Sequence, residues 1–413
     1  MFAYKLRRIG NDLQLLNGAE LKNAILIKGK EKQPLNKHSY IFSGAVEKID
    51  SDIAPGEVVC VRTHEGKFIA YGHYNPTSGI VIRLLEWNEN KHVNESWFRE
   101  KILSSIALRK SLFDSKDTDS FRLIFSEGDF LPGLIVDKFA DTLVLQSHTS
   151  GMDKEKSAIV KILTEEIASI TCIYEKSDGD GRKMEGLSNS AGVLFGIMPD
   201  KVMIRENGIK YKIDITSQKT GFYADQRNNR ALLKKYIKKD DSVLDLFSFT
   251  GGFGLTTALN GAGEITLCDS SAEAIAAAKV NFRLNGLDDP EAAEKDCFDY
   301  IRELHREKRQ FDIIILDPPK LMPKKNDAIK AMRAYKDLNF NTMRLVKKGG
   351  IMFTFSCSGN FTPEMFKEMI AYSAKDSGRT VQILEQLHQA SDHPVSVSVP
   401  ETEYLKGLVL RVL

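Results

Sequence analysis

The spacing of hydrophobic residues changes along the chain, and each change marks a different kind of structure. Near the N-terminus, short apolar runs are separated by Gly, Pro and Asn, which is the pattern of strands joined by turns. These runs lie at 24–27, 57–61, 68–71 and 80–83. They predict a small β-barrel, and the polar stretch at 86–94 predicts where this unit ends.

A helical pattern follows the polar stretch. Phe98, Ile102 and Ile106 recur at helical spacing and predict a helix from 96 to about 116. Strand-like runs come next at 121–125, 133–136 and 142–146, followed by a helical stretch at 153–167 and a strand at 172–175. This mixture predicts a central α+β module.

Beyond residue 200, predicted strands and helices alternate, which is typical of a doubly wound, mostly parallel sheet. The run at 311–316 is almost continuously apolar, as expected of a strand that is covered on both faces. The chain is therefore predicted to be an α/β protein with three parts: residues 1–87, 88–199 and a Rossmann-like domain at 200–413.

A glycine-rich turn follows the predicted strand at 243–247. Gly251, Gly252 and Gly254 allow a tight turn and close approach of a ligand, and the helix start beyond them offers free N–H groups. Asp269 ends the next strand roughly 20 residues later, where a carboxylate can bind ribose hydroxyls. The spacing differs from the Gly-x-Gly-x-x-Gly of dinucleotide sites, which leaves S-adenosylmethionine as the favoured ribose-containing cofactor. A purely structural turn is the alternative, and Asp245 together with Asp269 argues against it.

Two further acids follow later strands. Asp296 comes after the third strand, where it could accept a hydrogen bond from an adenine amino group or be an ordinary solvated turn residue. Asp317 falls at the carboxyl end of the run at 311–316, where the ligand crevice of such sheets lies. The prolines that follow bias it toward an extended backbone. The alternative is that Pro318 and Pro319 only stop the strand.

Cys357 follows another buried strand and is expected to emerge beside Asp317 on the same sheet edge. Free cysteine is usually a buried, inert residue, and Cys60, Cys172 and Cys268 fit that description. Cys357 differs because serine and glycine surround it past a strand end, where a thiol can ionise and attack. The chain's five cysteines lack paired short spacings, which predicts neither disulfides nor a zinc site.

Composition limits the remaining possibilities. With 413 residues and 42% hydrophobic content, the chain can form two or three packed domains. No apolar stretch approaches the roughly 18 residues that span a bilayer, and the start at 1–8 leads into polar sequence, so we expect a cytoplasmic protein without membrane contact. The net charge of +2 says little about nucleic acid.

The N-terminal unit nevertheless holds a local basic cluster. It consists of Lys28, Lys30, Lys32, Lys37, His38 and Tyr40. Such a cluster suits phosphate contacts and base stacking, although a solvated lysine face would look the same.

Separate motifs spread over nearly the whole chain carry a family resemblance. They are 38–46 (HSYIFSGAV), 131–134 (LPGL), 182–186 (RKMEG), 218–230 (QKTGFYADQRNNR), 392–395 (DHPV) and 404–407 (YLKG). With these motifs the chain resembles the PUA-domain-containing large-subunit ribosomal RNA cytosine-carbon-5 methyltransferases, a class I S-adenosylmethionine-dependent family.

This resemblance implies an RNA-binding PUA module, a central module and a catalytic Rossmann-like domain. It implies a cofactor and base pocket lined by Phe222, Asp245, Ser248, Gly251, Asp269, Asp296 and Asp317, with Cys357 as the nucleophile. Large-subunit ribosomal RNA or its precursor would be the partner, and homodimer formation stays open. Related 5-methylcytosine enzymes carry a second cysteine directly after Pro-Pro, where this chain has Lys320, so the base that removes the carbon-5 proton is unassigned.

The mechanism that we expect is covalent. The thiolate of Cys357 adds to carbon 6 of a flipped cytosine, carbon 5 takes the methyl group, and Asp317 hydrogen-bonds the ring-nitrogen edge. Three alternatives stay open: methylation of uracil carbon 5, methylation of a base nitrogen, and a non-catalytic RNA-binding assembly factor. The sequence does not decide whether His393 and Lys406 face the pocket.

Overall fold

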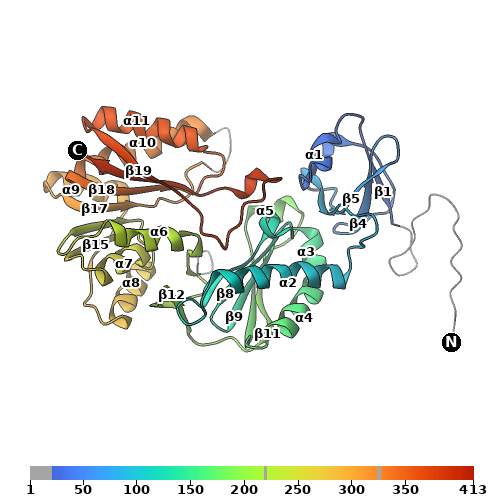
Figure 1. Cartoon of the computed structure of the whole chain (residues 1–413), viewed down its shortest axis with the longest axis horizontal. Coiled ribbons are helices and arrows are strands. Elements are labelled where there is room, and N and C mark those ends of the chain that lie inside the picture. Colours follow the sequence, from blue (N-terminus) through green and yellow to red (C-terminus); the bar gives the residue numbers. More distant parts are fainter. Residues whose placement is uncertain (1–20, 218–220, 323–326) are drawn as a thin grey trace, which may run out of the picture.

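The computed structural model describes residues 21–217, 221–322 and 327–413 (Figure 1). The stretch at 1–8, which supported the expectation of a cytoplasmic protein, lies outside these residues, as do 218–220 of the motif at 218–230. No helix in the described part is both long and apolar enough to cross a membrane.

The N-terminal unit is a mixed sheet with strand order β2-β6-β5-β4-β1-β3. Its strands are β1 (Asn23–Leu26), β2 (Tyr40–Phe42), β3 (Val46–Ile49), β4 (Val58–Arg62), β5 (Phe68–Tyr74) and β6 (Ile80–Glu86), with the short helix α1 (Lys32–Leu35) and a 3-10 turn at Ser43–Ala45. The predicted strands in this region are thereby confirmed. Ala24, Val59 and Ile82 are fully buried in its core, so the unit has its own hydrophobic interior.

The central module is a five-stranded sheet with order β11-β10-β9-β8-β7. It comprises β7 (Ser120–Phe125), β8 (Leu134–Phe139), β9 (Thr142–Ser147), β10 (Cys172–Ser177) and β11 (Ser190–Gly196), with helices α2 (Glu95–Leu112), α3 (Ser150–Lys154), α4 (Lys156–Glu166) and α5 (Asp180–Met184) and a 3-10 turn at Ser126–Asp129. The helix predicted at 153–167 is confirmed at Lys156–Glu166, and Glu155 separates it from a short preceding helix. The chain becomes helical earlier, because the Thr149 side chain caps α3 by accepting from Met152 N, and α4 then begins beyond Glu155.

The C-terminal domain holds a seven-stranded sheet with order β16-β15-β14-β17-β18-β20-β19. Its strands are β14 (Ser242–Leu246), β15 (Glu264–Asp269), β16 (Glu291–Glu294), β17 (Phe311–Leu316), β18 (Val346–Ser356), β19 (Val381–His388) and β20 (Lys406–Val412). The first five are parallel, and β20 runs antiparallel to β18 and β19. The mostly parallel α/β sheet is thus confirmed. Strand order reverses between β14 and β17, which is where ligands bind in such sheets.

Helices cover both faces of this sheet (Figure 1). They are α6 (Arg227–Leu232), α7 (Gly252–Leu259) and α8 (Ala272–Leu284) with one hydrophobic cluster, and α9 (Cys297–Arg306), α10 (Ala328–Leu345) and α11 (Pro363–Ser377) with the other. A hairpin of β12 (Val202–Glu206) and β13 (Ile209–Ile213) precedes the domain, and 3-10 turns lie at Ala224–Gln226, Leu233–Lys235 and Pro400–Thr402. Ile213 and Tyr211 of this hairpin join the cluster that contains α7 and α8.

A buried ionic network joins the central module to the C-terminal domain. Asp392 Oδ2 accepts from Arg122 N at 2.8 Å, and its Oδ1 lies 3.0 Å from Arg227 Nη1. Arg109 donates to both Asp129 oxygens and to the Asp392 carbonyl. Burial alone would raise the pKa of Asp392, but the neighbouring cations, Arg227 first, hold it well below the usual range. His393, whose role the sequence left open, is buried at this junction and contacts Asp392.

Candidate functional site

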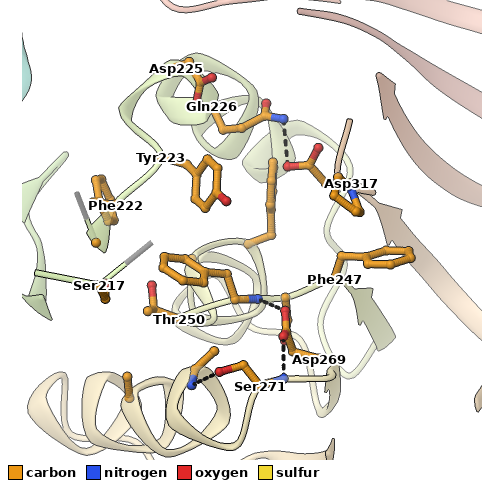
Figure 2. A pocket seen from close by; sticks show the side chains of 18 of the residues that line it. Ser217, Phe222, Tyr223, Asp225, Gln226, Phe247, Thr250, Asp269, Ser271 and Asp317 are labelled. Atoms are coloured by element: carbon orange, nitrogen blue, oxygen red, sulfur yellow. Dashed lines mark hydrogen bonds between the residues drawn. The ribbon is translucent and has the colours of Figure 1, made fainter. Parts of the chain in front are cut away.

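A cavity of about 590 Å³ lies beyond the carboxyl ends of the parallel strands, at the reversal of strand order. Phe222, Ser248, Asp269, Asp317 and Cys357 all line it, which brings most of the predicted site residues into one place. Figure 2 shows this pocket, with Phe222, Tyr223 and Gln226 facing the loops after β14, β15 and β17. Its size suits a small-molecule cofactor.

The loop from β14 to α7 has an unusual backbone. Phe247, Phe249 and Gly251 all have positive φ, at 60°, 47° and 79°, and Gly251 caps the start of α7. A Cβ on Gly254 would lie 2.5 Å from the buried Leu267 side chain, so a larger residue there would force Leu267 to shift. Gly251 is not among the described residues that line the cavity, and its contribution is to allow the shape of the turn. The N–H groups of Phe249 and Gly254 donate to the carboxylates of Asp269 and Asp245, which holds the turn in this shape beside the cavity.

Asp245 lies directly beneath this loop and is almost completely buried, with 1% of its surface exposed. Its Oδ2 accepts from Gly254 N at 2.9 Å, whereas Oδ1 has no hydrogen-bond partner within the described part of the chain. Burial raises the pKa of Asp245 to about 7, and the nearby carboxylates of Asp317 and Asp269 add to that rise. Asp245 was expected to line the pocket, but it is not among the described residues that line the cavity and lies behind them.

The raised pKa of Asp245 makes the stability of the protein depend on pH. Between about pH 4 and pH 7 the folded state holds a proton that the unfolded state has lost, so this group's stabilising contribution falls as the pH rises, by about 1.4 kcal/mol per unit at most. Asp245→Asn removes the titration. Urea unfolding across this pH range should show the wild type losing stability relative to the variant, and parallel curves would contradict the assignment.

Two other acids act on the backbone in different ways. Asp269 accepts from Phe249 N and from Ser271 N, each at 2.9 Å, and so fixes both loops that border the cavity (Figure 2). Asp296 is exposed and lies outside the cavity, where its Oδ1 accepts from Phe298 N at 2.8 Å and caps α9. The predicted contacts of Asp269 with ribose and of Asp296 with adenine stay predictions.

Asp317 is held by a residue that sequence reasoning missed. Gln226 is buried, and its Nε2 donates to Asp317 Oδ2 at 2.9 Å (Figure 2). The Gln226 Oε1 accepts from Asn229 Nδ2 at 2.6 Å, which orients the amide so that its donor faces the carboxylate. Asn229 in turn donates to the carbonyl of His388. The motif at 218–230 was the available signal, although spacing alone gives Gln226 no role.

Cys357 lies on the cavity wall at the end of β18 and is half-buried, whereas the other four cysteines are buried. Its Sγ is 4.0 Å from the carbonyl of Pro318, which places the thiol against the loop that carries Asp317. The predicted meeting of Asp317 and Cys357 at one sheet edge is therefore observed. Within residues 21–217, 221–322 and 327–413, no group of three or more His, Cys, Asp or Glu is arranged to hold a metal ion.

Aromatic and hydroxyl groups complete the pocket. Tyr223 and Phe249 meet edge to face with ring centroids 5.1 Å apart, and both line the cavity. Arg230 lies 4.8 Å above the Phe222 ring and keeps it in place. The Ser248 Oγ is buried without a hydrogen-bond partner in the described residues. Aromatic faces, a strand-end carboxylate and unsatisfied oxygens fit a nucleoside-containing cofactor such as S-adenosylmethionine.

Comparison with known families matches two parts of the chain. Residues 24–87 match the PUA-like domain, and residues 188–411 match the S-adenosylmethionine-dependent methyltransferase family. The second match contains β14, β15, β17 and β18, the strands that present the cavity.

Curated relatives cover almost the full length. "Ribosomal RNA large subunit methyltransferase I" of Alteromonas mediterranea is 40% identical over 94% of this chain and 98% of its own length. The protein of that name from Klebsiella pneumoniae (strain 342) is 38% identical, with the same coverage. Among solved structures, "SMU.776, a putative methyltransferase complexed with SAH" has a TM-score of 0.82 at 23% identity, and the match covers 94% of this chain and 100% of that chain. The last likeness shows the fold.

Proposed function

The chain belongs to the S-adenosylmethionine-dependent methyltransferases, in the PUA-containing group named for ribosomal RNA large subunit methyltransferase I. We propose that it methylates carbon 5 of a cytosine in large-subunit ribosomal RNA through a covalent adduct of Cys357. The observation that carries the proposal is the single cavity wall shared by the Cys357 thiol and the Asp317 carboxylate.

The pocket residues divide into cofactor and base contacts. When bound, S-adenosylmethionine supplies an electrophilic methyl group on a sulfonium. Asp269 would hold the ribose hydroxyls, Ser248 and Phe222 would contact the rest of the cofactor, and Asp245 supports their loop from beneath. Asp296 would reach the adenine only if its capping side chain turned from α9.

Cys357 and Asp317 would act on the base. Carbon 5 of cytosine is a poor nucleophile, and addition of a thiolate to carbon 6 moves electron density onto it. A bond forms between Sγ and carbon 6, the carbon-5 to carbon-6 double bond opens, and carbon 5 takes the methyl group. Asp317 hydrogen-bonds the ring-nitrogen edge throughout. Loss of the carbon-5 proton to a base then restores the double bond and expels the thiolate.

The alternatives differ in what they require of Cys357. Uracil carbon-5 methylation would use the same thiol, and only the recognised base edge would change. Methylation of a base nitrogen needs no thiol adduct, so a cysteine on the cavity wall would have no chemical part. A non-catalytic assembly factor would require neither an open cavity nor the cysteine. The position of Cys357 favours carbon-5 chemistry.

The N-terminal unit supports RNA as the partner. Lys28, Lys30, Lys32 and Lys37 of the basic cluster are all exposed and can contact phosphates. His38 of the same cluster approaches Glu401 at 3.3 Å, which links this unit to the C-terminal domain. We retain the division at 1–87, 88–199 and 200–413, and a cytoplasmic location, as parts of the proposal.

The experiment that tests the function compares ribosomal RNA from cells with and without this protein by mass spectrometry. We expect one 5-methylcytosine of the large-subunit RNA to be missing and to return with the wild-type gene. Loss of a 5-methyluridine or of an N-methylated base would assign the corresponding alternative. Unchanged modification together with no transfer of labelled methyl to the RNA would support the assembly factor.

Gln226→Met should slow methyl transfer because Asp317 loses the donor that fixes its carboxylate. Misplacing a group that orients the base lowers kcat, and we expect a loss of about 10- to 100-fold. Asn228→Ala, at an exposed neighbouring position on α6, is the matched control and should leave kcat unchanged. Single-turnover kinetics would check this, and unchanged kcat in Gln226→Met would remove Gln226 from the mechanism.

A further inference from the structure

Lys406 is a buried lysine that forms no ion pair with an Asp or Glu in the described part of the chain. It begins β20, and only 8% of its surface is exposed. Its Nζ donates to the carbonyl of Ser358 at 2.7 Å. A buried ammonium group is costly without a compensating negative charge, so its place in the fold requires an explanation.

The explanation lies in where the side chain runs. The β18–β20 ladder pairs Lys406 with Ser356, and the Nζ reaches the carbonyl of Ser358. Cys357 therefore lies in the chain between the two residues that Lys406 contacts, Ser356 through strand pairing and Ser358 through the Nζ. Among the described residues, Cys357 lines the cavity and Lys406 does not, so Lys406 approaches the segment around Cys357 without forming part of the pocket wall.

We propose that Lys406 is a positioning residue whose ammonium group stabilises the thiolate of Cys357. This proposal rests on the proposed function, in which Cys357 acts as a thiolate. The negative charge of that thiolate balances the buried ammonium group of Lys406. The thiol's proton leaves to solvent, and Lys406 keeps its own. The same charge would stabilise Cys357 again when elimination expels it from carbon 6.

The charged and titratable groups around the pair agree with this assignment. Burial lowers the pKa of Lys406 to about 8, and the group that opposes this most strongly is Cys357, followed by Glu403, while Lys320 adds to the lowering. Tyr335 and Tyr404 also face Cys357, and burial raises the pKa of both phenols, so they stay neutral near pH 7. Lys406 is thus the buried cation of this group.

The test is the pH dependence of Cys357 alkylation by iodoacetamide, in which the thiolate displaces iodide. Mass spectrometry of the Cys357 peptide gives the rate at each pH for the full-length protein without RNA. In the wild type we expect the alkylation rate to reach half its maximum at a pH below about 8.5, the ordinary pKa of a cysteine thiol. Lys406→Met should raise this midpoint by about 1 to 3 pH units, because Cys357 loses a nearby opposite charge.

Two further variants separate electrostatics from structure. Lys406→Arg keeps the charge and should restore most of the shift, and Lys348→Met, at an exposed lysine of β18, should behave as the wild type. Lys406→Met should melt at nearly the same temperature, because Cys357 then stays protonated and no buried charge is left without a partner. An unchanged midpoint in Lys406→Met would overturn the proposal. So would a rate that changes equally at every pH together with a lower melting temperature, since that is a structural effect.

Turnover provides a second readout. Methyl transfer by Lys406→Met should fall by about tenfold or more near pH 7 and recover as the pH rises, because each unit of pKa changes the thiolate fraction tenfold. The alkylation result does not depend on the RNA substrate. If Cys357→Ala kept full activity, the proposed function would fail while the thiol titration still reported on Lys406, so the two failures are distinguishable.

Discussion

Cys357→Ala is expected to abolish methyl transfer while S-adenosylmethionine binding stays nearly unchanged. The thiol is the group on the cavity wall that can add to carbon 6, and removal of a catalytic nucleophile typically costs on the order of 10⁴-fold or more in turnover. The aromatic and acidic cofactor contacts come from other loops, so the affinity for the cofactor should change little. Transfer of labelled methyl to ribosomal RNA and calorimetric titration with S-adenosylmethionine measure the two quantities.

Cys172→Ala is the matched control for this variant. Cys172 is a free cysteine buried on β10 in the central module, in a different sheet from the strands that present the cavity. Its replacement should leave turnover unchanged even if stability falls slightly. Activity retained by Cys357→Ala would refute the nucleophile assignment. Loss of both activity and cofactor binding would show that the thiol supports the pocket rather than the chemistry.

Glu206→Ala is expected to destabilise the C-terminal domain by about 3 to 5 kcal/mol, because the buried Arg230 loses its carboxylate partner and the buried Arg227 keeps only Asp392. Glu206 accepts from Arg230 at 2.7 and 2.8 Å and lies 3.3 Å from Arg227. All three side chains are almost fully buried. Arg230 also packs over Phe222, so weaker cofactor binding should accompany the loss of stability.

Urea unfolding monitored by circular dichroism measures this change. The control is Asp299→Ala, which removes an exposed ion pair with Arg302 on α9 and should change stability little. A loss in Glu206→Ala as small as that in the control would mean that the buried network does not hold the pocket. Unaltered cofactor affinity despite large destabilisation would separate Arg230 from the site.

Strand ends are the part of the site that sequence predicts well. Asp269 and Asp317 each follow an apolar run and reach the same sheet edge, because parallel strands end at the crevice. Cys357 follows β18 for the same reason. Burial of side chains is harder to predict. Asp245 on β14 and Gly251 in the loop that follows it lie behind the cavity lining, since residue type does not fix how deeply a side chain is buried.

Residues brought in by tertiary pairing could not be predicted. Gln226 comes from a 3-10 turn that precedes the sheet, and Lys406 from the antiparallel strand β20 beside β18. Their contacts join positions separated by 91 and 48 residues, which no local periodicity encodes. Asp296 is the opposite case: an aspartate directly before a helical segment is a common cap, and that signal was present in the sequence.

The covalent adduct is tested most directly with RNA that carries 5-fluorocytosine at the methylated position. Fluorine at carbon 5 cannot leave as a proton does, so the thiol, once added, stays bound to carbon 6. With S-adenosylmethionine present, we expect a methylated protein–RNA adduct that survives denaturation and maps to the Cys357 peptide by mass spectrometry. Methylation of the native RNA without any adduct on the fluorinated RNA, or an adduct at another residue, would contradict the proposed chemistry.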